Sequence, residues 1–137
     1  MSRTALITGI TGQDGAYLSK FLVDKGYKVF GTFRRTSTPN FWRLNYVNVL
    51  RDVELIPMDL TDFSSIVEAI RYSDPDEIYN LAAQSFVGRS FEEPISTSEV
   101  TGIGTTRVLE AARILNVDAR IYQASTSELY GNETSTT

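Results

Sequence analysis

Residues 4–15 read TALITGITGQDG, and this stretch decides the fold of the chain. A short apolar run leads directly into three glycines, Gly9, Gly12 and Gly15, after which apolar residues recur at helical spacing. In a strand–turn–helix unit such glycines allow a tight turn, a close backbone approach to a phosphate, and close packing of the helix on the sheet. The spacing is a variant of the usual dinucleotide fingerprint. Its position between a predicted strand and a predicted helix favours a phosphate-binding turn over a flexible turn that binds nothing.

The alternation of strands and helices continues along the chain. Hydrophobic patterning predicts five strands, at residues 4–8, 27–33, 53–58, 77–81 and 119–124, and helices at residues 16–25, 41–50, 63–70 and 96–115. Asp62 is placed to cap the third helix, whereas Pro57 fits poorly inside a central strand. This order predicts an α/β fold, with one domain over residues 1–137 and a doubly wound parallel sheet of the Rossmann type that stops after its fifth strand. Ligands bind such sheets beyond the carboxyl ends of the strands.

The composition restricts the chemistry that is open to the chain. Its 137 residues carry a net charge of -4, which provides no overall attraction to nucleic acid or to an anionic membrane. Cysteine and histidine are both absent, so no thiolate or imidazole metal ligand exists and no metal site is expected. The apolar stretch at the start is too short for a signal peptide or a membrane span, and a cytoplasmic location is expected.

The end of the second predicted strand indicates which dinucleotide is bound. NAD-binding sheets usually place an acidic residue there to hold the ribose hydroxyls, but this chain has Arg34 and Arg35. A guanidinium group can hold the 2′-phosphate of NADP through two parallel hydrogen bonds, so NADP is the expected cofactor. The alternative is a solvated pair of charges at a strand end.

Two further strand ends complete the predicted cofactor site. Asp59 and Leu60 follow the third strand and could hold the adenine edge; a helix-capping aspartate is the alternative. Small side chains after the fourth strand would let the backbone lie against a flat cofactor. The predicted cofactor-binding residues are Gly9, Thr11, Gly12, Gln13, Asp14, Gly15, Arg34, Arg35, Asp59, Leu60, Leu81, Ala82, Ala83, Gln84 and Ser85.

Hydroxyl and carboxylate groups follow the fifth predicted strand, at residues 125–128. Thr126 can hydrogen-bond a sugar hydroxyl, and Glu128 can remove a proton next to a carbonyl group. The alternative is that Ser125 and Glu128 form a helix capping box.

The motifs at residues 9–15, 80–85 and 123–131 together resemble the extended short-chain dehydrogenase/reductase family, and most closely its members that dehydrate GDP-mannose. The resemblance covers essentially the whole chain. It implies that NADP takes a hydride from C4 of the hexose, that water leaves across C5 and C6, and that the hydride returns at C6. Thr126 would then assist at the C4 oxygen, and Glu128 would be the C5 base. Ser127 stands where related deoxyTDP-sugar dehydratases carry an aspartate acid, which favours the GDP-mannose branch.

One departure from the family pattern concerns the hydride step. The family uses a Tyr-x-x-x-Lys pair, and no lysine follows Lys28 in this chain. The pair and the domain that binds the sugar nucleotide are therefore expected to lie outside the chain, which is expected to be inactive alone. Two alternatives stay open: a nucleotide-sugar epimerase or 4-keto reductase of the same family, and a non-catalytic dinucleotide-binding module.

The resemblance also implies a homo-oligomer, because members of the family form dimers and tetramers. Phe41 and Trp42, in the segment after the second predicted strand, would suit a contact between subunits if they are exposed. The alternative is that both rings pack on their own domain.

Overall fold

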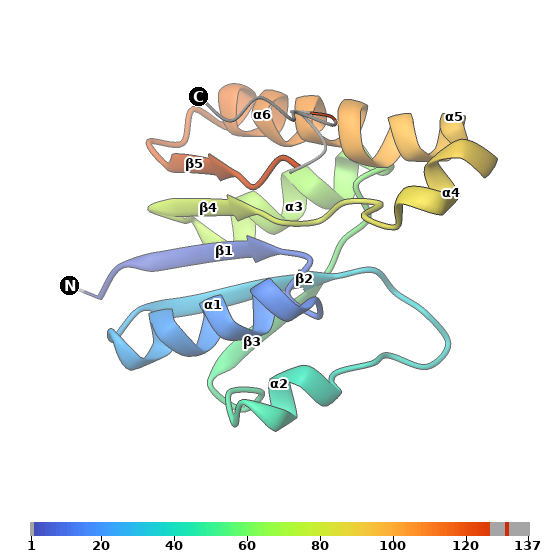
Figure 1. Ribbon diagram of the computed structural model, residues 1–137. Coiled ribbons are helices and arrows are strands. Elements are labelled where there is room, and N and C mark those ends of the chain that lie inside the picture. Colours follow the sequence, from blue (N-terminus) through green and yellow to red (C-terminus); the bar gives the residue numbers. More distant parts are fainter. Residues whose placement is uncertain (1, 127–130, 132–137) are drawn as a thin grey trace, which may run out of the picture.

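The computed structural model describes residues 2–126 and residue 131, and it contains a sheet of five parallel strands (Figure 1). The strands are β1 (Thr4–Thr8), β2 (Lys28–Phe33), β3 (Val53–Pro57), β4 (Glu77–Asn80) and β5 (Arg120–Gln123). Their order across the sheet is β3-β2-β1-β4-β5, and every neighbouring pair is parallel. The chain extends the sheet in one direction from β1 and then returns to add β4 on the other side of β1. A crevice for a ligand is expected at this reversal, between the ends of β1 and β4.

Helices cover both faces of this sheet, as the doubly wound prediction requires. They are α1 (Gln13–Asp24), α2 (Trp42–Tyr46), α3 (Phe63–Ser73), α4 (Val87–Glu92), α5 (Pro94–Thr97), the π-helix η1 (Ser98–Ile103) and α6 (Gly104–Leu115). Figure 1 shows α1 in front of the strands and α3 behind them. Among the described residues, no helix is long and apolar enough to cross a membrane.

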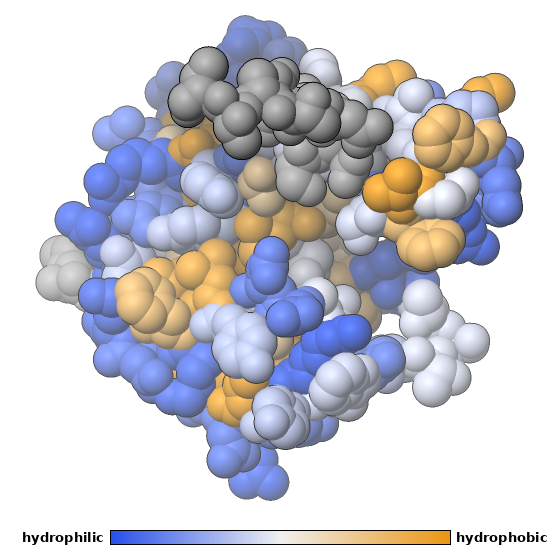
Figure 2. All heavy atoms as spheres, viewed as in Figure 1, coloured by the Kyte–Doolittle hydropathy of each residue, from blue (hydrophilic) through white to orange (hydrophobic). Residues whose placement is uncertain are grey.

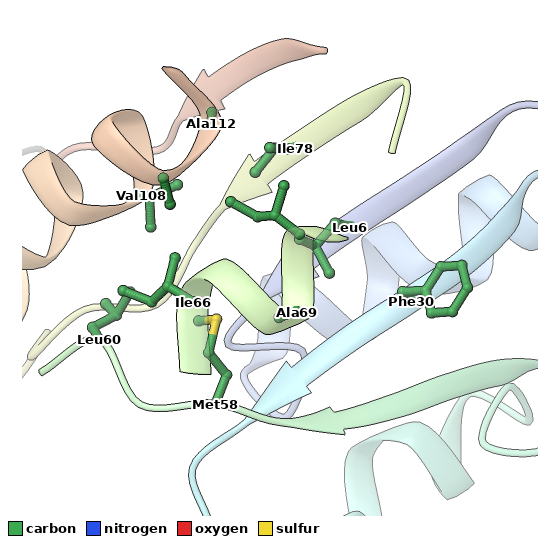
Figure 3. Close-up of a cluster of buried hydrophobic side chains, with 11 residues drawn as sticks. Leu6, Phe30, Met58, Leu60, Ile66, Ala69, Ile78, Val108 and Ala112 are labelled. Carbon is green, nitrogen blue, oxygen red and sulfur yellow. The ribbon is translucent and has the colours of Figure 1, made fainter. Parts of the chain in front are cut away.

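Alternating side chains of the strands build two hydrophobic layers, because successive residues of a strand point to opposite faces. Leu6 lies beside Phe30 on β2 and Ile78 on β4, and these three pack against α3 and α6. Figure 3 shows Leu6 and Ile78 in one cluster with side chains of both helices. On the opposite face, Ala5 and Ile7 pack with residues of α1 and α2. The apolar run of β1 is thus buried on both sides, which explains its continuous hydrophobicity.

The third strand forms in spite of Pro57, because β3 is an edge strand. Pro57 is its last residue and lies opposite Phe33, and the next residue, Met58, donates its N–H to the Phe33 carbonyl at 2.9 Å. Proline has no backbone N–H and cannot donate a hydrogen bond to a neighbouring strand. A central strand pairs on both sides and needs such donors, whereas an edge strand pairs on one side only and tolerates the loss. The prediction that Asp62 caps a helix is confirmed, since its carboxylate accepts the Ser64 N–H at 3.0 Å at the start of α3.

The single long helix predicted for residues 96–115 is wrong in detail. The segment begins earlier, at Pro94, and contains the π-helical stretch η1 between α5 and α6. A further helix, α4, occupies residues that the hydrophobic pattern left unassigned, and none of its side chains is buried. Amphipathic periodicity is the signal that reveals helices in a sequence, and a helix without a buried face lacks that signal.

Candidate functional site

A cleft of about 420 Å³ lies beyond the carboxyl ends of β1 to β4, where the strand order reverses. Its volume falls in the range that is usual for sites that bind small molecules and cofactors. Most of the predicted cofactor-binding residues line it: Gly9, Thr11, Gly12, Arg34, Asp59, Leu60, Leu81, Ala82, Ala83, Gln84 and Ser85. The topology thus gathers segments that are far apart in the sequence into one site.

The turn after β1 depends on Gly9. Its φ of +68° lies in the left-handed region, and a Cβ at this position would lie 2.9 Å from Cα of Ala82. A residue with a side chain would therefore meet both backbone strain and a clash with the segment that follows β4. Glycine lets the ends of β1 and β4 approach, and this approach forms the floor of the cleft.

The other two glycines of the turn, Gly12 and Gly15, place the first turn of α1 at this floor. Gly12 directly precedes α1 and lines the cleft. Gly15 is buried, and a Cβ there would lie 2.7 Å from both the Gly9 carbonyl oxygen and Cα of Ile10, so the helix packs closely on the turn. The first backbone N–H groups of α1 have no partner within a helix, and together with the helix dipole they attract an anion. The arrangement suits a phosphate group.

A polar network inside the sheet was missed by the sequence analysis. The buried hydroxyl of Thr8 donates to Oδ1 of Asn80 at 2.6 Å and accepts the N–H groups of Leu81 and Ala82 at 3.1 and 3.0 Å. The Asn80 amide in turn donates to Oε1 of Gln123 at 2.6 Å. This network joins the ends of β1, β4 and β5 and holds the segment after β4 against the cleft. The available signal was a polar residue at the carboxyl end of each of the strands β1, β4 and β5.

On the side of the cleft that is lined by the ends of β2 and β3, the structure separates the two arginines. Arg34 lines the cleft, whereas Arg35 does not. Asp59 lies near Arg34, and its Oδ1 accepts the N–H and the hydroxyl of Thr61 at 2.8 and 2.7 Å. Burial raises the pKa of Asp59, but the hydrogen bonds from Thr61 and the charge of Arg34 outweigh this effect and lower it below its ordinary value. Asp59 is therefore ionised at neutral pH, and the helix-capping role belongs to Asp62 instead.

Three predicted site residues of the glycine turn and the helix start lie away from the cleft. Gln13 and Asp14 are exposed on the first turn of α1, and Gly15 is buried beneath it. Gln13 instead lines a second, separate hollow of about 260 Å³ between α1 and α2. The backbone of this turn can still face a phosphate, because the anion is held by N–H groups rather than by these side chains.

The predicted catalytic residues are placed only in part. Thr126 follows β5, is exposed and does not line the cleft, while Ser125 before it has a φ of +59°. The backbone N–H of Ala124 donates to the Asn80 carbonyl at 3.2 Å, which attaches the start of this segment to the sheet. Ser127 and Glu128 lie outside the residues that the structure describes. Within the described part of the chain, no group of three acidic residues is placed to hold a metal ion.

The two aromatic residues considered for a subunit contact differ in their surroundings. Phe41 packs edge-to-face on Phe33 with ring centroids 5.1 Å apart, whereas Trp42 is 53% exposed. A separate group of exposed apolar side chains, Phe86, Val87, Phe91 and Ile95, lies on α4, α5 and the residue before α4. Figure 2 shows hydrophobic side chains gathered over this part of the surface.

Comparison with known proteins places this chain in a family. A family model described as GDP-mannose 4,6 dehydratase matches residues 6–137. The GDP-mannose 4,6-dehydratase of Yersinia enterocolitica is 50% identical over 136 residues, which cover 94% of this chain and 37% of that protein. The chain therefore spans little more than a third of the length of this relative.

Solved structures confirm the Rossmann-type fold. UDP-glucose 4-epimerase from Brucella ovis, crystallised with NAD, has a TM-score of 0.83 at 23% identity, covering 98% of this chain and 39% of the epimerase. UDP-glucose 4-epimerase from Thermus thermophilus, also in complex with NAD, has a TM-score of 0.71 at 28% identity, covering 83% of this chain and 35% of that enzyme. The chain shares its fold with epimerases. The family model that matches it and the relatives with higher sequence identity are described as GDP-mannose 4,6-dehydratases. The chain thus belongs to the GDP-mannose 4,6-dehydratase family.

Proposed function

We propose that this chain is the cofactor-binding part of an NADP-dependent GDP-mannose 4,6-dehydratase. The complete protein would convert GDP-mannose to GDP-4-keto-6-deoxymannose. The observation that carries the proposal is the close approach of Gly9 to Ala82, which forms the floor of a cleft at the point where the strand order reverses. The family match and the NAD complex of the Thermus thermophilus enzyme support a nicotinamide dinucleotide in this cleft.

The residues present fit such a cofactor. The diphosphate would meet the backbone of residues 9–12 and the positive end of α1, where the absence of side chains on Gly9 and Gly12 lets an anion approach the main chain. Leu81, Ala82 and Ala83 would lie against the flat rings. The cofactor held there would supply the reversible hydride transfer that oxidation at C4 and reduction at C6 of the sugar require.

We assign the preference for NADP to Arg34. Arg34 lines the cleft and its charge acts on Asp59, and a guanidinium there can bind the 2′-phosphate of the adenosine. The lowered pKa of Asp59 keeps that carboxylate charged, so it would accept hydrogen bonds from ribose or adenine. The same charge would repel a phosphate that lay next to Asp59. Arg35 would add to the positive potential without direct contact.

The proposed roles of the chain's own groups in the dehydration follow from their chemistry. Thr126 would hydrogen-bond the oxygen at C4 and so orient the sugar. Once C4 is a ketone, the C5 proton is acidic enough for a carboxylate base, and Glu128 would remove it. Both roles rest on the family's motif at these positions. The tyrosine and lysine of the hydride step would come from outside these residues.

The cofactor proposal is tested by titrating the 137-residue chain with NADPH and with NADH, with nucleotide fluorescence as the readout. We expect tighter binding of NADPH. Arg34→Gln should weaken NADPH binding by roughly ten- to a hundredfold, the usual range for a lost charge-assisted hydrogen bond, and should leave NADH binding nearly unchanged. Arg35→Gln is the matched comparison and should have a smaller effect. Equal affinities for the two nucleotides would contradict the assignment of Arg34.

The activity of the complete protein is tested by product mass. A dehydratase yields a nucleotide sugar lighter by one water, whereas an epimerase yields a product of unchanged mass. Glu128→Gln in that protein should abolish the loss of water and leave NADPH affinity intact. Turnover of GDP-mannose to an isobaric product would favour the epimerase alternative, and NADPH binding with no turnover would favour the non-catalytic module.

A further inference from the structure

The helical segment of α5, η1 and α6 touches the cleft on two sides. Thr101 of η1 accepts the N–H of Gln84, from the segment after β4, at 3.1 Å. Gly104 at the start of α6 faces Leu60, from the segment after β3, so closely that a Cβ there would lie 3.0 Å from Cβ of Leu60. Val100 of η1 lines the cleft itself. The π-helical stretch therefore sets how far apart the two walls stand.

The guanidinium group of Arg107 holds η1 and the segment after β3 together on the Leu60 side. Nη1 of Arg107 donates to the carbonyl oxygens of Leu60 and Glu99, both at 3.2 Å, and Nη2 donates to the Glu99 carboxylate at 2.7 Å. The Arg107 side chain is only 23% exposed, so water competes little for these contacts. One side chain of α6 thus joins η1 to the segment that follows β3.

Another ion pair of the same helix provides a contrast. Arg113 pairs with Glu110 one turn away at 2.6 Å, but its side chain is 72% exposed, and Glu110 lies on α6 itself. Such a local, solvated pair contributes little to a fold. Arg107 differs because its partner Leu60 belongs to a distant segment, and because that segment carries Asp59 and forms one wall of the cleft.

We infer that Arg107 is a positioning residue for cofactor binding: it holds the Asp59–Leu60 segment at the distance from η1 that the adenine end of the dinucleotide requires. Arginine is needed because its planar fork reaches two carbonyl oxygens and a carboxylate together, whereas the ammonium group of lysine is a single point charge. Arg107 itself does not touch the cofactor. The inference rests on the proposed cofactor site, and it adds a residue that lies outside the cleft lining.

The test compares Arg107→Met with Arg113→Met in the full chain. Methionine keeps an unbranched apolar stem and removes the donors. Dissociation constants for NADPH and for adenosine 2′,5′-bisphosphate, which represents the adenine end, are measured at a temperature where thermal unfolding shows each variant to be folded. We expect Arg107→Met to weaken both ligands by a similar factor of roughly tenfold, and Arg113→Met to leave both within about twofold. Arg107→Lys should restore only part of the affinity.

A role in stability alone would lower the unfolding midpoint of Arg107→Met but leave both dissociation constants unchanged, and this result would overturn the inference. Weaker NADPH binding with unchanged binding of adenosine 2′,5′-bisphosphate would overturn it as well, because the effect would then lie elsewhere. If Arg107→Met does not fold, Glu99→Gln provides the same comparison, with a smaller expected loss for both ligands. Absence of NADPH binding by the unchanged chain would instead contradict the proposed function, and the inference with it.

Discussion

Two glycines with left-handed backbones make different demands on the sequence. Gly9 has a φ of +68° and lies against the backbone of Ala82, whereas Gly26 has a φ of +81° and open space around it. Gly26 follows α1 and ends that helix, so it needs glycine for its conformation only. Gly9 needs glycine for its conformation and for the absence of a side chain.

The pair Gly9→Ala and Gly26→Ala separates these two effects. Gly26→Ala should lower the free energy of unfolding by about 1 kcal/mol, the cost of a left-handed conformation for an L-residue. Gly9→Ala should lower it by about 2–4 kcal/mol, because the clash with Ala82 adds to the same strain. Urea denaturation followed by circular dichroism measures both values. Equal losses for the two variants would show that the Ala82 contact does not restrict position 9.

At the scale of elements, side-chain hydrogen bonds connect the strands at the point where the ladder of backbone hydrogen bonds between them ends. Thr8, Asn80 and Gln123 are the last residues of β1, β4 and β5, and their side chains form one connected network. The ladder between β1 and β4 ends at these residues, and beyond them the Ala124 N–H still donates to the Asn80 carbonyl at 3.2 Å. The side-chain network helps to fix the spacing of the strand ends, and the burial of Thr8 and Asn80 makes each missing partner there costly.

Thr8→Val tests this network with a substitution of nearly the same shape. It leaves Oδ1 of Asn80 and two backbone N–H groups without their partner, and we expect a loss of about 2–3 kcal/mol in the free energy of unfolding. Thr106→Val on α6 is the control, because that hydroxyl is exposed and makes only a long contact of 3.5 Å. A similar, small effect of both substitutions would contradict a structural role for the buried hydroxyl.

Across the whole molecule, the cleft and the opposite edge of the sheet are held by different chemistry. At the amino ends of the strands, buried Glu77 pairs with Arg120 at 2.8 Å and with Arg3 at 3.5 Å, and it accepts the Tyr79 hydroxyl at 2.7 Å. These contacts join β4 to β5 and to the segment before β1. Burial, and next the hydrogen bond to Glu77, raise the pKa of Tyr79 from 10.0 to about 12.

This shift predicts how stability changes in alkali. The unfolded chain loses the phenol proton near pH 10 and the folded chain only near pH 12, so the stabilisation from neutral Tyr79 is complete below pH 10 and is lost as the pH rises to 12. The loss is at most about 3 kcal/mol, the equivalent of roughly two pKa units, and solvent screening at this partly exposed phenol makes it smaller. Tyr79→Phe should flatten the free energy of unfolding between pH 10 and 12. Tyr46→Phe, at a side chain that is 77% exposed, is the control, and the same flattening there would refute the assignment to Tyr79.

The sequence by itself determined the order of the five strands and the position of the cleft. The apolar run of β1, the glycine turn, the Asp62 cap and the alternation of strands with helices are local patterns, and local patterns can be recognised without the fold. They also located the glycine turn, Arg34 and the segment after β4, because parallel strands bring all their carboxyl ends to one edge. The exact start of each helix was less certain, and α4 was not predicted because it buries no face.

Only the tertiary structure decided which of these residues meet. It placed Arg34 in the cleft and Arg35 outside it, brought Gly9 against Ala82, and joined Arg107 to the carbonyl of Leu60. It also showed that Thr8 and Asn80 are partners across two neighbouring strands. Each of these contacts joins residues that are distant along the chain or depends on the direction in which a side chain points after packing. No periodicity or spacing in the sequence encodes such contacts, because they arise from the burial of whole layers rather than from the conformation of one segment.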